Sequence, residues 1–272
     1  MRVNFYYPGS IGEVLQGKVN GRDMLVSFPV NLYTCVEVFK EKFEEKEIEK
    51  ENIKSYTFLN NILRRWKLEG KEKLGLKITS QIPKGKGFAS STADLCALYH
   101  CLVRYFNRKF DIKELIEEAI RIEPTDSIVF NKATLFDYKC GQYFEILGDY
   151  MEFYVYVFEG LEEVDTIKFN LSVKEPLAEV DDLFQLLKNS IKNKDIKLLA
   201  QVSTESIKRN QKRLYYPILD EVISIMRKTG GLGVIGGHSG NFLGIIYDSK
   251  VDLNIRLEGY KRYWVKTLSM IY

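Results

Sequence analysis

The chain has 272 residues, of which 45% are hydrophobic and 28% charged, and this composition excludes a wholly disordered protein. Its 40 Lys and Arg nearly balance its 37 Asp and Glu, so the net charge of +3 gives no sign of a nucleic-acid partner. The 4 Cys and 2 His lack the spacing of a zinc site.

No apolar run is long enough to cross a bilayer, and the first residues lack the apolar segment of a secretory signal. We therefore expect a cytoplasmic protein that has no membrane partner and keeps its scattered cysteines reduced. The length suits either one large domain or two of ordinary size.

The beginning of the chain predicts short strands separated by turns. Pro8-Gly9-Ser10 is typical of a turn, and Asn20-Gly21 is a strong hairpin signal. Runs rich in Val, Leu, Tyr and Thr predict strands at 3–7, 13–16, 24–28 and 32–39.

The rest of the chain mixes helices and strands. A charge run at 40–54 indicates a solvated segment without a functional role. Apolar residues at helical spacing predict helices at 56–68, 95–106, 112–122, 180–192, 196–212 and 218–228. Other apolar runs predict strands at 74–78, 144–147, 151–158, 242–247 and 260–270. This order favours an α+β fold, and the element count favours domains at 1–150 and 151–272.

A glycine-rich loop joins a predicted strand to a predicted helix. Its glycines permit backbone torsions that turn amides toward a ligand, and its lysine at 86 adds a mobile cation. Its hydroxyl residues stand where the helix begins, beside unpaired N–H groups and the positive end of the helix dipole. These features together predict a polyphosphate cradle. The candidate nucleotide-binding residues are Pro83, Lys84, Gly85, Lys86, Gly87, Phe88, Ala89, Ser90, Ser91 and Thr92.

Two common phosphate-binding patterns, the P-loop and the Rossmann fingerprint, are absent from this loop. The plain alternative is a glycine turn followed by a helix that Ser91 and Asp94 cap. Two further motifs elsewhere in the chain favour phosphate binding instead.

Three segments, in this order along the chain, resemble the motifs of the GHMP kinases, a family that includes galactokinase, homoserine kinase and mevalonate kinase. The first segment, 7–17, has Pro-Gly followed by Gly-Glu. The central segment, 83–93, reads Pro-x-Gly-x-Gly-x-x-Ser-Ser-x-Ala. The third segment, 236–243, is glycine-rich and runs into a predicted strand. Together they are far more specific than any one of them.

Within that family, the letters are similar to those of the L-threonine kinases of cobalamin biosynthesis. The similar letters are Gly-Glu-x-x-Gln-Gly at 12–17, Gly-Lys-Gly at 85–87, Ala-Ser-Ser-Thr-Ala-Asp at 89–94, Glu-Pro-Thr-Asp-Ser at 123–127 and His-Ser-Gly at 238–240. The resemblance implies transfer of the γ-phosphoryl group of ATP, with Mg²⁺, to the hydroxyl of L-threonine. It also implies an N-terminal domain like ribosomal protein S5, a C-terminal ferredoxin-like domain, and an active site between them.

The resemblance further implies roles for single residues. Ser91 and Glu123 would hold Mg²⁺, with Glu117 and Glu118 as fallbacks for the carboxylate, and Asp126 matches the catalytic aspartate. Glu13 would meet the ammonium group of an amino acid, while the partner of its carboxylate group stays open. The candidate acceptor-binding residues are Ser10, Glu13, Gln16, Asp126, Gly237, His238 and Ser239.

Two other functions stay open at this point. The first is another small-molecule kinase of the same family, acting on homoserine or a sugar. The second is a binding protein that keeps the fold without catalysis. Loss of Ser91, Glu123 or Asp126 would favour the binding protein, and all three are present.

Overall fold

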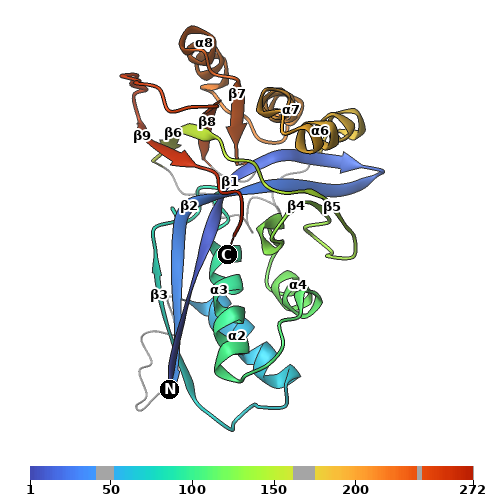
Figure 1. Cartoon of the computed structure of the whole chain (residues 1–272), viewed down its shortest axis with the longest axis vertical. Helices are drawn as coiled ribbons and strands as arrows, with labels where there is room; N and C mark the ends of the chain where they lie inside the picture. The colour runs from blue at the N-terminus through green and yellow to red at the C-terminus, as the bar shows by residue number, and fades with distance from the viewer. Residues whose placement is uncertain (41–51, 162–174, 238–240, 272) are drawn as a thin grey trace.

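The computed structural model describes residues 1–40, 52–161, 175–237 and 241–271. A long antiparallel hairpin of β1 (Arg2–Val19) and β2 (Arg22–Lys40) runs through the molecule (Figure 1). Asn20 and Gly21 form its turn with φ values of 50° and 72°, which confirms the hairpin signal.

The four strands predicted before residue 40 all lie within β1 and β2, but the breaks predicted inside each pair are wrong, because β1 and β2 are each continuous. Pro8 does not begin a turn. It lies inside β1, where the register against β2 shifts three times between Pro8 and Leu15. Such bulges let a strand accommodate Pro and Gly, so a turn-like sequence remains part of the sheet.

The hairpin is the middle of a nine-stranded sheet with the order β5-β4-β2-β1-β7-β8-β6-β9, and β3 also pairs with β2. A single residue pair, Glu13 with Gly236, joins β1 to β7. The remaining strands are β3 (Leu74–Ser80), β4 (Ala133–Phe136), β5 (Phe144–Gly148), β6 (Tyr154–Gly160), β7 (Gly233–Gly236), β8 (Phe242–Tyr247) and β9 (Tyr260–Lys266).

The helices gather in two groups on either side of the bend in the hairpin (Figure 1). One group has α3 (Ser90–Tyr105) against β1 and β2, with α2 (Ile53–Arg65) and α4 (Ile112–Ile120) packed on it. The other group is α6 (Asp181–Asn193), α7 (Ile196–Arg209) and α8 (Leu219–Thr229). Helices α6 and α7 contact β1, and α7 and α8 contact β7. This mixture of sheet and helix confirms the predicted α+β fold.

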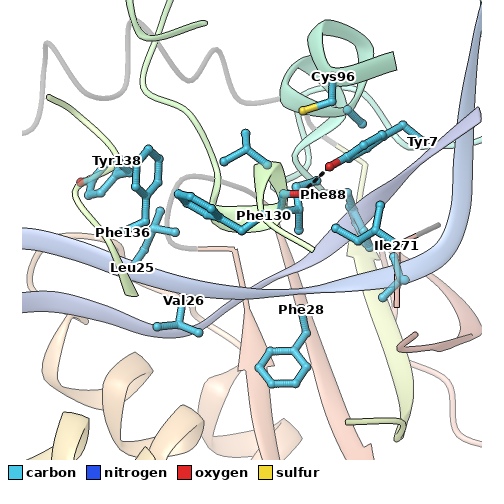
Figure 2. Packing of buried hydrophobic residues seen from close by; sticks show 14 of the residues in the cluster. Tyr7, Leu25, Val26, Phe28, Phe88, Cys96, Phe130, Phe136, Tyr138 and Ile271 are labelled. Carbon is cyan, nitrogen blue, oxygen red and sulfur yellow. Dashed lines mark hydrogen bonds between the residues drawn. The ribbon is translucent and has the colours of Figure 1, made fainter. Parts of the chain in front are cut away.

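Buried aromatic side chains fill the space between the hairpin and the segments around residue 130 (Figure 2). The hydroxyl of Tyr7, on β1, donates to the carbonyl oxygen of Ile128 at 2.7 Å. Ile128 belongs to a short helical turn, η1 (Ser127–Val129), so the core fixes that turn against the sheet. Within the described ranges, no helix has the length and apolar character to cross a membrane.

Candidate active site

Asp126 is fixed by hydrogen bonds from several elements near the start of α3. It precedes η1 and caps it, with its Oδ1 accepting from the N–H of Ile128 at 3.0 Å. Its Oδ2 accepts from the hydroxyls of Ser27 at 2.9 Å and Ser10 at 3.3 Å. Its own N–H donates to Oγ1 of Thr92, on the first turn of α3, at 3.1 Å. Strands β1 and β2 therefore fix the carboxylate of Asp126, and helix α3 fixes its backbone.

Burial, together with the nearby carboxylate of Glu13, raises the pKa of Asp126 to about 7. The hydrogen bonds from Ile128, Ser27 and Ser10 oppose this rise. A carboxyl group with a pKa near neutrality exchanges protons readily at physiological pH, as a general base requires.

The raised pKa has a consequence for folding. Asp126 binds its proton more tightly in the folded chain than in the unfolded chain, so its contribution to stability falls as pH rises from about 4 to 7. Relative to Asp126→Asn, the wild-type free energy of unfolding should therefore fall between pH 4 and pH 8 by on the order of 2–4 kcal/mol. Urea unfolding of both proteins across this range measures the difference. Parallel stability curves would show that the carboxyl group is not perturbed.

Three segments far apart in sequence meet beside Asp126. The N–H of Ser10 donates to the carbonyl oxygen of Phe88 at 2.9 Å, which ties β1 to the glycine loop. The ring of Phe88 stacks on that of Phe242, on β8, with centroids 4.3 Å apart. A Cβ atom on Gly237 would lie 3.0 Å from Cα of Gly87, so only backbone separates the loop from the third motif there.

The contact between the first and third motifs requires glycine. Gly12 has a φ of +65°, and a Cβ atom there would lie 2.5 Å from the carbonyl oxygen of Gly236. This conformation is one that side-chain-bearing residues rarely adopt, and the clash is with backbone that cannot give way. The close approach places Glu13 directly opposite Gly236.

The glycine loop ends in an unusual helix start. Gly85 and Gly87 have φ values of 65° and 90°, and Ala89, which precedes α3, has a φ of 53°. No side chain caps α3, so the plain alternative, a helix capped by Ser91 and Asp94, is wrong. A left-handed Ala is strained, and such strain gathers at functional sites. The first-turn N–H groups of α3 keep the positive end of the helix dipole open to an anion.

Lys86 is not the mobile cation that its place in the loop predicts. It is 5% exposed, and its ammonium donates to the carbonyl oxygens of Gly160 at 2.9 Å and Leu161 at 2.8 Å. These bonds fasten the loop to the end of β6. The exposed cation of the loop is Lys84, whose charge lowers the pKa of Asp94.

Glu123 follows α4 and is 8% exposed. Its Oε2 accepts from the ammonium of Lys54 at 2.6 Å, while its Oε1 is buried without a hydrogen-bond partner among the described residues. Burial, helped by the charge of Glu123, raises the pKa of Asp94, on α3, to about 6 against a 2.6 Å hydrogen bond from Thr34. Glu123 therefore lies near the beginning of α3.

These residues fit a magnesium ion bound together with nucleotide phosphates. Mg²⁺ prefers oxygen ligands and takes few from the protein, and Glu123 offers an unpaired oxygen near the hydroxyls of the α3 start. Within the described ranges, no cluster of three or more His, Cys, Asp or Glu is placed to hold a metal. The fallback residues Glu117 and Glu118 instead accept from the guanidinium of Arg65 at 2.6 and 3.1 Å.

On the acceptor side, Glu13 is 6% exposed, and its charge raises the pKa values of Asp126, Tyr138 and Tyr216. Gln16, three residues further along β1, has a buried Oε1 with no hydrogen-bond partner in the described part of the chain. The predicted acceptor residues His238 and Ser239 lie outside the described residues.

Sequence reasoning missed the turn between α7 and α8. The predicted helix at 196–212 ends at Arg209, and the chain then turns toward the site. The side-chain amide of Asn210 donates to the carbonyl oxygen of Gln16 at 2.9 Å, and the hydroxyl of Tyr216 donates to that of Gly237. The turn is thus fastened to both the first and the third motifs. None of the three motifs includes this turn, and in the sequence only Tyr216 hints that the turn packs against the rest of the chain.

Named relatives support the inference, drawn from the three motifs, that this chain resembles a kinase. Two curated proteins named L-threonine kinase are similar over most of the chain. That from Citrobacter freundii is 27% identical over 248 residues, covering 89% of this chain and 85% of the relative. That from Salmonella typhimurium is 26% identical over 272 residues, covering 95% and 89%.

Solved structures share the fold. A homoserine kinase from Cytophaga hutchinsonii is 15% identical with a TM-score of 0.72, covering 99% of this chain and 95% of the other. A mevalonate kinase from Methanococcus jannaschii is 14% identical with a TM-score of 0.68, covering 98% and 99%.

Two family models match the chain in succession. Residues 52–131 match the GHMP kinases N terminal domain, and residues 169–266 match the GHMP kinases C terminal model. Kinases of this family transfer a phosphoryl group from ATP to a small molecule. With both family models matched in order along the chain, this chain belongs to the GHMP kinases.

Proposed function

We propose that this kinase transfers the γ-phosphoryl group of ATP to the hydroxyl of L-threonine, giving O-phospho-L-threonine for cobalamin biosynthesis. The observation that carries the proposal is the similarity to two L-threonine kinases along most of the chain. The alternatives, homoserine and sugar acceptors, have support only from the fold. We also propose that the two domains divide near residue 150, between β5 and β6.

In this proposal the glycine loop binds the triphosphate. The open N–H groups at the start of α3 and the backbone of Gly85 and Gly87 hydrogen-bond to phosphate oxygens. Ser91 and Glu123 would hold Mg²⁺, which would supply positive charge to the phosphates of the nucleotide. The oxygen that Glu123 would offer is Oε1, while its Oε2 accepts from Lys54.

Asp126 and Glu13 act on the acceptor. As the threonine oxygen forms its bond to the γ-phosphorus, the bond from that phosphorus to the β–γ bridging oxygen breaks and ADP leaves. Asp126 takes the proton of the hydroxyl, which its near-neutral pKa of about 7 allows. The carboxylate of Glu13 pairs with the ammonium group of threonine and fixes the direction of the hydroxyl.

An acceptor panel tests the proposed substrate. We expect kcat/KM to be highest for L-threonine, with L-serine lower by about 10–200-fold because it lacks one methyl group. L-homoserine, whose hydroxyl lies one carbon further out, D-threonine, mevalonate and galactose should be worse. The measurement is ADP release with each acceptor under one set of conditions, with mixtures lacking acceptor as the control.

Each other outcome of the panel has a distinct meaning. If homoserine or a sugar gives the highest kcat/KM, the acceptor is wrong while the kinase assignment stands. If ATP binds and no acceptor is phosphorylated, the chain is a binding protein with the kinase fold.

A further inference from the structure

Two buried polar atoms near Glu13 have no hydrogen-bond partner among the described residues. They are the hydroxyl of Tyr138 and Oε1 of Gln16, and their side chains come from different parts of the chain. Tyr138 is 4% exposed and Gln16 is 5% exposed. Because a buried polar atom without a partner destabilises a fold, each such atom in a native protein calls for an explanation. A polar ligand that supplies the missing partners is one.

Tyr138 is fixed beside the catalytic region by its backbone. Its carbonyl oxygen accepts from the N–H of Thr125 at 2.9 Å, and Thr125 immediately precedes Asp126. Its ring lies beside Phe136, over the hairpin at Leu25 (Figure 2). The hydroxyl is therefore held in place before any ligand arrives.

Arg213 brings a positive charge to the same place. It lies in the turn after α7, where its N–H donates to the carbonyl oxygen of Asn210 at 2.9 Å. The side chain of Asn210 in turn holds the backbone of Gln16. One guanidinium nitrogen of Arg213 donates to the carbonyl oxygen of Glu175 at 2.9 Å, which orients the group.

The charges around Tyr138 are of opposite sign. Burial raises the pKa of the Tyr138 phenol, the carboxylates of Asp23, Glu13 and Asp137 raise it further, and the guanidinium of Arg213 opposes the rise. Carboxylates and one guanidinium thus both act on a hydroxyl that has no hydrogen-bond partner among the described residues. An α-amino acid in its zwitterionic form carries this same pair of charges, one carbon atom apart.

We propose that Arg213 and the hydroxyl of Tyr138 bind the α-carboxylate of the acceptor, opposite the ammonium site at Glu13. Gln16 Oε1 accepts a hydrogen bond from the ammonium group. This inference rests on the proposed function, because it assumes an amino-acid acceptor. Arg213 and Tyr138 are then specificity-determining residues that select an amino acid over an amino alcohol.

The test compares two acceptors that differ only in the carboxylate. They are L-threonine and (R)-1-amino-2-propanol, which keeps the ammonium group and the secondary hydroxyl. Dissociation constants from calorimetry and kcat/KM values are measured for the wild type, Arg213→Ala and Arg213→Lys. Lys212→Ala, which removes the neighbouring exposed cation, is the matched control.

Arg213→Ala should lower kcat/KM for L-threonine by about 10–150-fold, mainly through KM, because it removes a charged hydrogen-bond donor. The value for the amino alcohol should change by less than about threefold, since no carboxylate is present to feel the loss. Arg213→Lys should restore part of the activity with threonine, and Lys212→Ala should match the wild type.

Tyr138→Phe separates binding from structure. Because its hydroxyl has no protein partner among the described residues, its removal should leave the melting temperature unchanged or slightly higher. The KM for L-threonine should still rise by about 5–10-fold, the effect of one lost hydrogen bond.

Two results would overturn the inference. One is an unchanged affinity and kcat/KM for L-threonine in Arg213→Ala, and the other is an equal loss with both acceptors, which would indicate a structural role. Either result, with a wild type that phosphorylates threonine, leaves the proposed function standing. A wild type that neither binds nor phosphorylates threonine contradicts the proposed function itself.

Discussion

Asp126→Asn should lower kcat by about 10²–10⁴, the usual effect of removing a positioned acid–base group. Asn has the same shape and keeps hydrogen-bonding capacity toward Ser27 and Ile128, but it cannot take a proton. The affinity for ATP should change by no more than about threefold, because the proposed contact of Asp126 is with the acceptor. Steady-state kinetics and nucleotide titration measure the two effects separately.

A matched control is Asp195→Asn. Asp195 also caps a helix, with Oδ1 accepting from the N–H of Leu198 at 2.9 Å, but it lies at the start of α7. Asn caps as well as Asp, so this variant should keep wild-type turnover. If Asp126→Asn also keeps most of its turnover, Asp126 is a turn former and catalysis depends on positioning and electrostatics alone.

Ser91→Ala and Glu123→Gln should each raise the Mg²⁺ concentration for half-maximal activity by at least about 10–100-fold. Even residues that only support a metal ligand cause a loss of that size, and these two are the proposed ligands themselves. Magnesium titrations of kinase activity at saturating ATP measure the shift, and circular dichroism checks the fold.

Glu117→Gln is the control for the carboxylate, because Glu117 pairs with Arg65 at 2.6 Å and is not expected to meet the metal. Lys54→Ala tests the same site from the other side. Removing the ammonium that contacts Oε2 of Glu123 at 2.6 Å should lower the Mg²⁺ requirement, since a positive charge beside the proposed metal ligand is lost. An unaltered magnesium dependence in both Ser91→Ala and Glu123→Gln would remove them as ligands.

The helices of this fold could be predicted from the sequence better than its strands. The predicted helices at 112–122 and 218–228 match α4 and α8 within about two residues, because apolar spacing reports directly which face is buried. The strand β4 was missed, since four buried residues carry no alternation. The turn predicted at Pro8 does not form, because bulges keep this turn-like sequence within β1.

Some residues of the candidate site could be predicted from the sequence and others could not. Asp126 and the glycine loop stand in recognisable motifs, so their positions could be anticipated. The anchoring of Lys86 by β6 carbonyl oxygens could not, because it joins residues 74 and 75 positions apart. Arg213 and Tyr138 carry no motif at all, and they come near Glu13 only through long-range contacts of the folded chain.

The backbone contact between Gly12 and Gly236 limits which residues can be changed when the acceptor preference is redesigned. A side chain at position 12 would meet a backbone oxygen at 2.5 Å, so a library of variants must leave that glycine unchanged. Positions 138 and 213 have no left-handed φ, so their backbone sets no such limit. Their side chains do support the fold, because Tyr138 belongs to the buried core and Arg213 donates to the carbonyl oxygen of Glu175. Substrate engineering of this enzyme should therefore keep Gly12 and should measure stability whenever position 138 or 213 is changed.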